Sequence, residues 1–142
     1  QLHDVAEREH SGGRKLVDED WFCRKLWALE VDHAALQQTI QRFVAEAAAG
    51  KTLGAETSML KARGTVLFQE ARSLLVDAVG YYGLPNEFDV VALEESGEAE
   101  QFFGPHYATT LAAQRYTSRG SSIAGGSYEV QARVTAKRVL GL

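Results

Sequence analysis

The sequence predicts an all-α fold, an up-and-down four-helix bundle. Two long stretches, at about 19–49 and 55–79, repeat apolar residues with the 3.6-residue period of a helix. Two shorter stretches near the C-terminus carry helix start and stop signals, and no segment alternates in the manner of a strand. Four helices with mostly short connections are typical of such a bundle.

The first long helix is predicted from about residue 19 to residue 49, where Gly50 supplies the stop. Spacings of four and three place its apolar residues on one face. This face consists of Phe22, Leu26, Leu29, His33, Leu36, Ile40, Phe43 and Ala47. Residues 1–13 before it are expected to be the end of a preceding helix and a turn.

The second long helix, about 55–79, has a broader apolar face and contains Gly64, which costs about 1 kcal/mol relative to alanine in a helix. This cost suggests the close approach of a neighbouring backbone, or an ordinary helix glycine. After Gly80 to Pro85, residues 86–104 are rich in carboxylates. We interpret them as a solvated acidic loop.

A third, weaker helix is expected from Tyr107 to about Arg119. A turn rich in glycine and serine, 120–126, leads to the last helix at about 127–140. Lys137 and Arg138 lie in its last turn, where cations suit the helix dipole. The whole chain, 1–142, is therefore expected to be one helical domain.

Composition excludes several classes. The chain has 142 residues, 45% of them hydrophobic, and a formal net charge of −4. Its acidic balance argues against electrostatically driven nucleic-acid binding, and no apolar run approaches the ~20 residues of a membrane helix. A single cysteine, Cys23, can form neither an internal disulfide nor a zinc cluster. The first residues carry no initiator methionine, which predicts a fragment of a longer chain. They also lack the charged-then-apolar pattern of a signal peptide, and we expect a cytoplasmic protein.

Gly125-Gly126-Ser127 stands directly before the last helix, with the hydroxyl residue at the N-cap position. Free N–H groups and the positive dipole end at a helix start attract anions, and glycine lets a phosphate approach the backbone. Taken alone, this pattern is also that of an ordinary turn.

Two Glu-x-x-His pairs, Glu7/His10 and Glu30/His33, match the spacing by which ferritin-like bundles hold two metal ions. His10 abuts a helix break, however, and Glu30 lies toward the edge of the apolar face. We therefore expect no metal site and interpret His33 as a core or interface histidine.

Other reactive side chains give weaker signals. Cys23 lies in a helical run beside Phe22, which favours an inert buried thiol. The aromatic residues have the chemistry to stack on a ring system, but we interpret them as packing residues. These are Trp21, Trp27, Tyr81 and Tyr82.

The last residues, Ser-Ile-Ala-Gly-Gly-Ser-Tyr-Glu-Val-Gln-Ala-Arg-Val-Thr-Ala-Lys-Arg-Val-Leu-Gly-Leu from Ser122, strongly resemble the closing signature of the acyl-CoA dehydrogenase family. That signature reads Ile-Tyr-Gly-Gly or Ile-Tyr-Glu-Gly, then Thr or Ser, a Glu-Ile-Gln helix start and a similar ending. The stretches from Leu26 to Thr39 and from Gly54 to Lys61 agree in order and spacing. The chain is thus similar to the C-terminal helical domain of a three-domain flavoprotein.

The resemblance implies an oxidoreductase of fatty acid metabolism that uses FAD. Such enzymes convert an acyl-CoA thioester to the trans-2-enoyl-CoA: a carboxylate base takes the α-proton, and a hydride passes to the flavin. It also implies self-association as a dimer or tetramer through the helices, and an acceptor such as an electron-transfer flavoprotein. As an isolated fragment, the chain is expected to have no dehydrogenase activity.

Carried over residue by residue, the resemblance assigns cofactor contacts to the start of the last helix. Ser127 matches the hydroxyl residue that contacts the FAD diphosphate or ribose region in relatives. Glu129 stands where a polar side chain often joins it, and Gly126 supplies the close backbone approach.

This chain also departs from the family pattern. Gly125 stands where many members carry the catalytic glutamate, and Ala124 replaces the preceding tyrosine. The base must then come from an earlier helix or from a partner subunit, or the chain is a catalytically silent member of a mixed oligomer. Near Ser11, only this serine and Gly13 fit a flavin-contacting element of relatives. Two aspartates, Asp20 and Asp77, fall near places where relatives often carry flavin-contacting glutamines.

Overall fold

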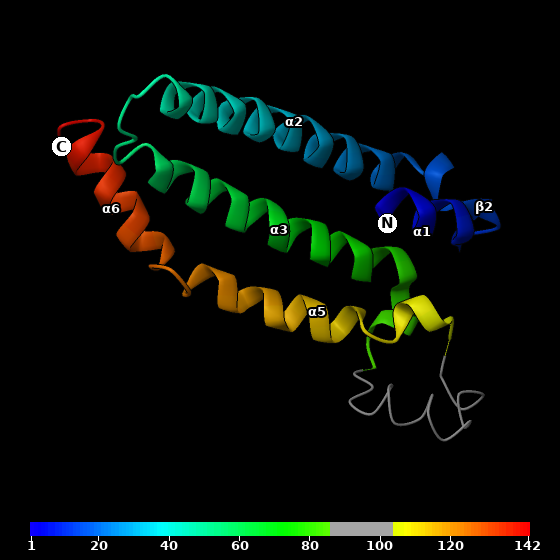
Figure 1. The fold of residues 1–142 in the computed structure, drawn as a ribbon. Helices are drawn as coiled ribbons and strands as arrows, with labels where there is room; N and C mark the ends of the chain where they lie inside the picture. Colours follow the sequence, from blue (N-terminus) through cyan, green and yellow to red (C-terminus); the bar gives the residue numbers. More distant parts are fainter. Residues whose placement is uncertain (86–103) are drawn as a thin grey trace.

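The computed structural model describes residues 1–85 and 104–142, and this part of the chain is mostly helical (Figure 1). Its five α-helices are α1 (Leu2–Arg8), α2 (Asp20–Ala48), α3 (Thr57–Val79), α5 (Leu111–Ser118) and α6 (Tyr128–Arg138). Short 3-10 turns lie at Leu16–Asp18, Gly80–Gly83, His106–Ala108 and Arg119–Ser122. The prediction of an all-α fold is confirmed.

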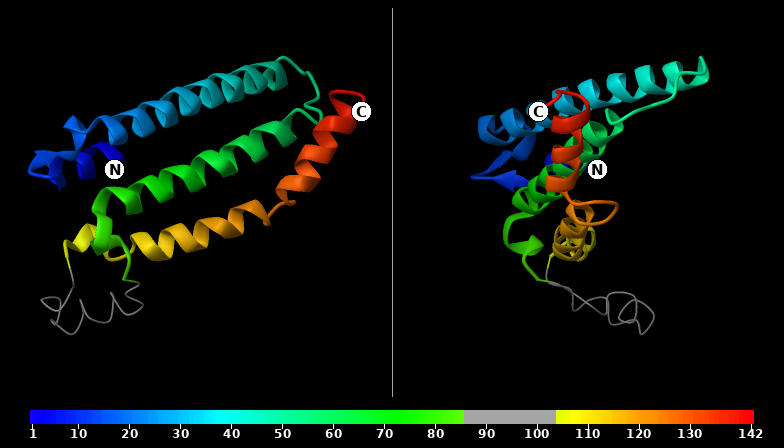
Figure 2. Two further views of the ribbon diagram at one scale, coloured as in Figure 1. Left: turned by 180° about the vertical axis from the view of Figure 1, so that it is seen from behind. Right: turned by 90° about the vertical axis from the view of Figure 1, so that its left-hand side faces the viewer.

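Helix α3 is the centre of the molecule and contacts α1, α2, α5 and α6. Helices α2 and α5 lie on opposite sides of α3 and run roughly parallel to its axis, so the three form a layer (Figure 2). Neighbours in this layer run antiparallel, as the up-and-down connectivity predicts. Among the described residues, no helix has the length and apolar character of a membrane span.

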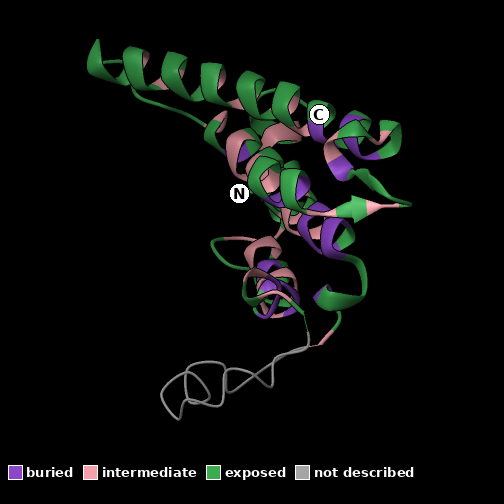
Figure 3. Cartoon of the chain, turned by 90° about the vertical axis from the view of Figure 1, so that its right-hand side faces the viewer, coloured by how far each residue is buried: buried purple, intermediate pink, exposed green. Residues whose placement is uncertain are grey.

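The core lies where α1, the first turns of α2, the last turns of α3 and the start of α5 meet (Figure 3). Phe22, Leu16 and Leu111 are its largest fully buried side chains. Burial of such side chains gives about 1.5–3 kcal/mol each, so this end of the layer holds most of the packing energy.

Beyond these first turns, the predicted apolar face of α2 is only partly covered. Phe22 and Leu26 are buried, whereas Ile40 is 41% exposed and His33 is also exposed. The core reading of His33 is therefore wrong for this chain, because α3 covers only one edge of α2. Leu36 does contact α3: a Cβ added at Gly64 would lie 3.6 Å from its Cδ2 atom. The close neighbour of Gly64 is thus a side chain rather than a backbone.

A two-residue hairpin connects α1 to α2, with β1 (His10–Ser11) paired antiparallel to β2 (Arg14–Lys15). Gly12 and Gly13 make its turn at φ 58° and 86°, where a side chain would be strained. The expectation of no strand is wrong for these four residues, which are too short to show alternation. The acidic loop predicted at 86–104 lies outside the described residues except for Gly104.

Tyr107 ties the chain after this segment to the end of α1. Its hydroxyl donates a hydrogen bond to Glu9 Oε1 at 2.5 Å, and the guanidinium of Arg8 lies over its ring at 5.6 Å. Burial and the bond to Glu9 raise the pKa of Tyr107 to about 12. The neutral phenol is thus a stabilising contact between segments 98 residues apart.

We expect stability to fall as the pH rises from about 10 to about 12. The phenol of the unfolded chain ionises at a pKa near 10, whereas the folded chain keeps its proton up to about pH 12. The contribution of the contact is thus complete below pH 10 and is lost as the pH rises. Urea unfolding at several pH values checks this: Tyr107→Phe should remove this part of the fall and Tyr116→Phe should retain it. A Tyr107→Phe profile identical to that of the unaltered protein would refute the assignment.

Candidate functional site

The turn before α6 is partly open to solvent: Gly125 is exposed, and Gly126 and Ser127 are half-buried. Gly125 and Gly126 have φ of 70° and 95°, in the left-handed region that glycine adopts readily. Ser127 is the N-cap residue, and its side-chain oxygen accepts a hydrogen bond from the Val130 N–H at 3.4 Å. The expected helix start is therefore present, displaced by one residue from the prediction.

Glu129 shows that this helix start stabilises negative charge. A hydrogen bond from its own backbone N–H and one from the Ser127 hydroxyl lower the pKa of its carboxyl group. The carboxylate is fully exposed, so this effect comes from the donors and not from burial. The donors at this helix start therefore already bond to a carboxylate of the chain itself.

Gln131 completes the turn, and the sequence analysis missed it. Its side-chain amide donates to the Gly125 carbonyl oxygen at 3.0 Å. A Cβ added at Gly126 would lie 2.5 Å from the Gln131 Nε2 atom, the end of a flexible side chain that can shift, so it is the φ angle of 95° that favours glycine at this position. The signal was available, because Gln131 lies one helical turn after Ser127.

A second candidate site is a cavity of about 470 Å³ beside the hairpin. It brings together Ser11 of β1, Trp21 of α2, Asp77 of α3 and the two tyrosines of the Gly80–Gly83 turn, Tyr81 and Tyr82. Ser11 and Asp77 were expected near a flavin, whereas Gly13 and Asp20 do not line this cavity. The aromatic side chains that line this cavity have the chemistry to stack on a planar ring system.

Lys25 neutralises the carboxylate in this cavity. Its Nζ atom lies 3.1 Å from Asp77 Oδ2 and 5.3 Å from the centre of the Trp21 ring. Asp77 therefore presents little net negative charge to a ligand. Sequence reasoning did not single out Lys25, because its partner lies 52 residues away.

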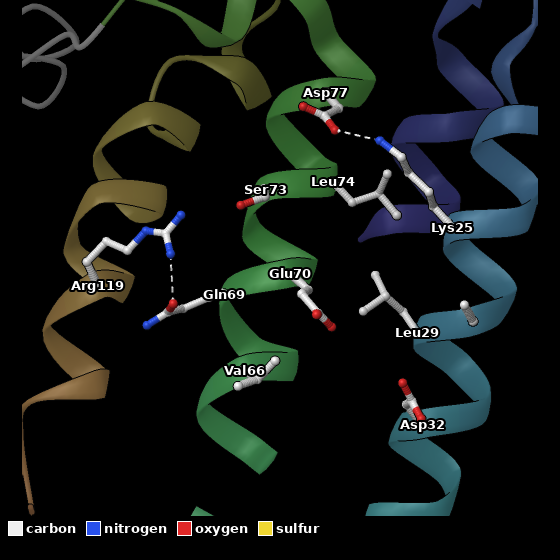
Figure 4. Close-up of a pocket in the computed structure, with 11 residues that line it drawn as sticks. Lys25, Leu29, Asp32, Val66, Gln69, Glu70, Ser73, Leu74, Asp77 and Arg119 are labelled. Atoms are coloured by element: carbon white, nitrogen blue, oxygen red, sulfur yellow. Dashed lines mark hydrogen bonds and ion pairs between the residues drawn. The ribbon is translucent and has the colours of Figure 1, made fainter. Parts of the chain in front are cut away.

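Another cavity, of about 570 Å³, is lined by residues of α2 and α3 and by Arg119 (Figure 4). Its polar side chains include the Lys25–Asp77 ion pair and Arg119, which donates to Gln69 Oε1 at 2.9 Å. It contains none of the predicted cofactor residues of the α6 turn. Asp77 lines both this cavity and the hairpin cavity, so the ion pair lies between them.

The family-model comparison matches residues 1–140 to the acyl-CoA dehydrogenase C-terminal domain. The chain belongs to the acyl-CoA dehydrogenase family. No curated protein and no solved structure matches it. Acyl-CoA dehydrogenases are oxidoreductases that generally use FAD, bind acyl-CoA and self-associate.

In this acyl-CoA dehydrogenase domain, the α6 turn and the hairpin cavity are separate. No residue of α6 lines the cavity, and the hairpin and α6 lie at opposite ends of the helical layer (Figure 1). The structure therefore brings Ser11 and Asp77 together, and Gly126, Ser127 and Glu129 together, but does not join the two groups.

The metal alternative finds no support in the side-chain arrangement. Glu30 contacts His3 of α1 instead of His33, and His10 Nδ1 hydrogen-bonds with the Arg8 carbonyl oxygen at 3.1 Å. Within residues 1–85 and 104–142, no group of three or more metal-ligating side chains converges. Cys23 is buried, as expected, with its thiol donating to the Val17 carbonyl oxygen at 2.9 Å.

Proposed function

We propose that this chain is the helical C-terminal domain of an FAD-dependent acyl-CoA dehydrogenase and that the α6 turn holds the phosphate-bearing part of the cofactor. One observation carries this proposal: a half-buried turn at Gly126 and Ser127 that leads into a helix N-terminus, where hydrogen-bond donors lower the pKa of the Glu129 carboxyl group.

Each residue of the turn has a definite task. The backbone N–H of Glu129 and the Ser127 hydroxyl, which bond to the Glu129 carboxylate in this structure, would turn to the phosphate when the cofactor binds. The carboxylate of Glu129 is an acceptor suited to a ribose hydroxyl. When bound, FAD supplies the hydride acceptor for α,β-dehydrogenation of the acyl-CoA.

Gly125 has no group that can take a proton, which favours a second candidate function. The carboxylate base of the reaction must come from another helix or another subunit. A catalytically silent partner in a mixed acyl-CoA dehydrogenase oligomer would need no base of its own.

Exposed apolar residues on two sides of α2 support self-association. Trp27, Val31, Ile40 and Val44 are 58%, 70%, 41% and 62% exposed. Residues 33–41 contain no Asp, Glu, Lys or Arg, and depletion of charge is typical of an interface core. A second copy of the protein would remove this apolar surface from water.

Flavin retention tests the proposed cofactor site. We expect Ser127→Ala to weaken FAD binding by the intact protein about tenfold, because it removes a hydrogen-bond donor to a charged group. Ser122→Ala is the matched control, since the Ser122 hydroxyl bonds to the Arg119 carbonyl oxygen within the turn before. Fluorescence titration of the apoprotein with FAD gives both affinities.

Equal FAD affinity in the Ser127→Ala variant and the unaltered protein would contradict the site. Activity separates the two candidate functions. An intact protein that reduces an electron acceptor with an acyl-CoA substrate is a dehydrogenase, whereas activity only after addition of a second subunit identifies the silent partner.

A further inference from the structure

The helical layer has two helix–helix interfaces, one between α2 and α3 and one between α3 and the α5 segment (residues 111–122). The lysine and arginine side chains at these two interfaces have different kinds of partner. Between α2 and α3, Lys25 pairs with Asp77, and Arg63 pairs with Asp32. Between α3 and the α5 segment, the cations instead bond to neutral groups. Lys61 donates to the Ser121 carbonyl oxygen, Arg72 to Gln114 Oε1, and Arg119 to Gln69 Oε1.

Arg72 lies at a cavity of about 340 Å³ on this second interface. Arg72 as a whole residue is half-buried, and its guanidinium carbon lies 5.2 Å from the centre of the Phe68 ring. The described residues that line the cavity include no carboxylate. Arg72 has five N–H donors and uses one of them on Gln114, and among the described residues its guanidinium makes no ion pair with a carboxylate.

Polar side chains of α5 and of the residues at its two ends line the same cavity. Thr110, Gln114, Thr117 and Ser121 recur at spacings of three and four residues, which places them in one row. The Thr110 Oγ1 atom accepts a hydrogen bond from Gln114 Nε2 at 3.0 Å, so its own proton is available. The Thr117 backbone carbonyl accepts from the Arg119 N–H, whereas its side-chain hydroxyl makes no hydrogen bond within the part of the chain that the structure describes.

We propose that this cavity, lined by Phe68, Arg72, Thr110, Ala113 and Thr117, binds the phosphate group of a small organic phosphate. Arginine offers parallel N–H donors that match two phosphate oxygens, and the threonine hydroxyls donate to the remaining oxygens. Phe68, 44% exposed, and Ala113 form an apolar wall for the organic part. This site lies between α3 and α5 and is distinct from the proposed flavin contacts at the α6 turn.

The proposal is tested by titrating the protein with inorganic phosphate and with phenyl phosphate. Binding is observed in ¹H–¹⁵N NMR spectra. We expect saturable shifts at Arg72, Thr110 and Thr117. Tighter binding of phenyl phosphate identifies an organic phosphate as the ligand, and equal or weaker binding than inorganic phosphate contradicts that part of the proposal. Sodium chloride at matched ionic strength should not reproduce the shifts.

Arg72→Gln should weaken phosphate binding about tenfold, because it removes charge-assisted hydrogen bonds. Arg63→Gln is the matched control: Arg63 lies on the same helix, and its cation is already paired with Asp32. Arg72→Lys keeps the charge and serves if the glutamine variant does not fold; it should retain binding with lower affinity.

Three results would overturn the proposal: unchanged affinity in both Arg72 variants, equal loss in Arg63→Gln, or shifts confined to the α6 turn around Ser127. The last result separates this site from the flavin site. A Ser127→Ala variant that loses FAD binding should still bind phosphate at Arg72. The two sites are therefore tested independently, and a negative result at one does not affect the test of the other.

Discussion

Replacing Phe22 by alanine should lower the free energy of unfolding by about 3–5 kcal/mol. Phe22 is fully buried where α2 enters the core, and the Trp21 ring packs edge-on against it at 5.6 Å. The substitution removes apolar contacts and leaves a cavity, because the surrounding helices can collapse only partly. Urea unfolding followed by circular dichroism measures the loss.

Tyr116→Ala is the control for Phe22→Ala. Tyr116 is an aromatic residue of similar size, but it is 67% exposed on α5. We expect this change to cost less than about 0.5 kcal/mol. Similar losses in the two variants would contradict the position of the core described here.

Leu111→Ala should cost about 2–5 kcal/mol. Leu111 is 1% exposed and anchors the first turn of α5 to the core beside α3. Because α5 has only eight residues, it is too short to be stable without this packing. Hydrogen exchange of the α5 amides should therefore accelerate together with the fall in global stability.

Ile123→Ala provides the comparison, since Ile123 is 74% exposed in the turn after α5. It should leave both the urea midpoint and the exchange rates nearly unchanged. Slow exchange of α5 in the Leu111→Ala protein would show that another contact holds this helix.

The helices could be predicted from the sequence because apolar periodicity and helix start and stop residues are local signals. The range predicted for the first long helix, 19–49, is close to the observed Asp20–Ala48, and the second, 55–79, is close to Thr57–Val79. The third was predicted too early, since residues 106–108 form a 3-10 turn before α5 begins. Helix ends depend on contacts outside the helix, which periodicity does not report.

The α6 turn could likewise be predicted, because its glycines and Ser127 are adjacent in the sequence. The hairpin cavity could not be predicted as a unit. It joins Ser11, Trp21 and Asp77, whose proximity depends on how α2 packs against α3. The apolar period of α2 failed at His33 for the opposite reason: a period shows which face is apolar but not which neighbour covers it.

Helix α6 has no buried residue. This lack of burial determines which part of the molecule unfolds first. An element with few buried contacts unfolds locally at a small fraction of the global cost. The C-terminal helix is therefore expected to fray first, while the Phe22 end remains folded. A ligand that binds at the Ser127 turn would have to order this helix in order to bind. Binding of such a ligand should therefore make residues 128–138 more resistant to proteases.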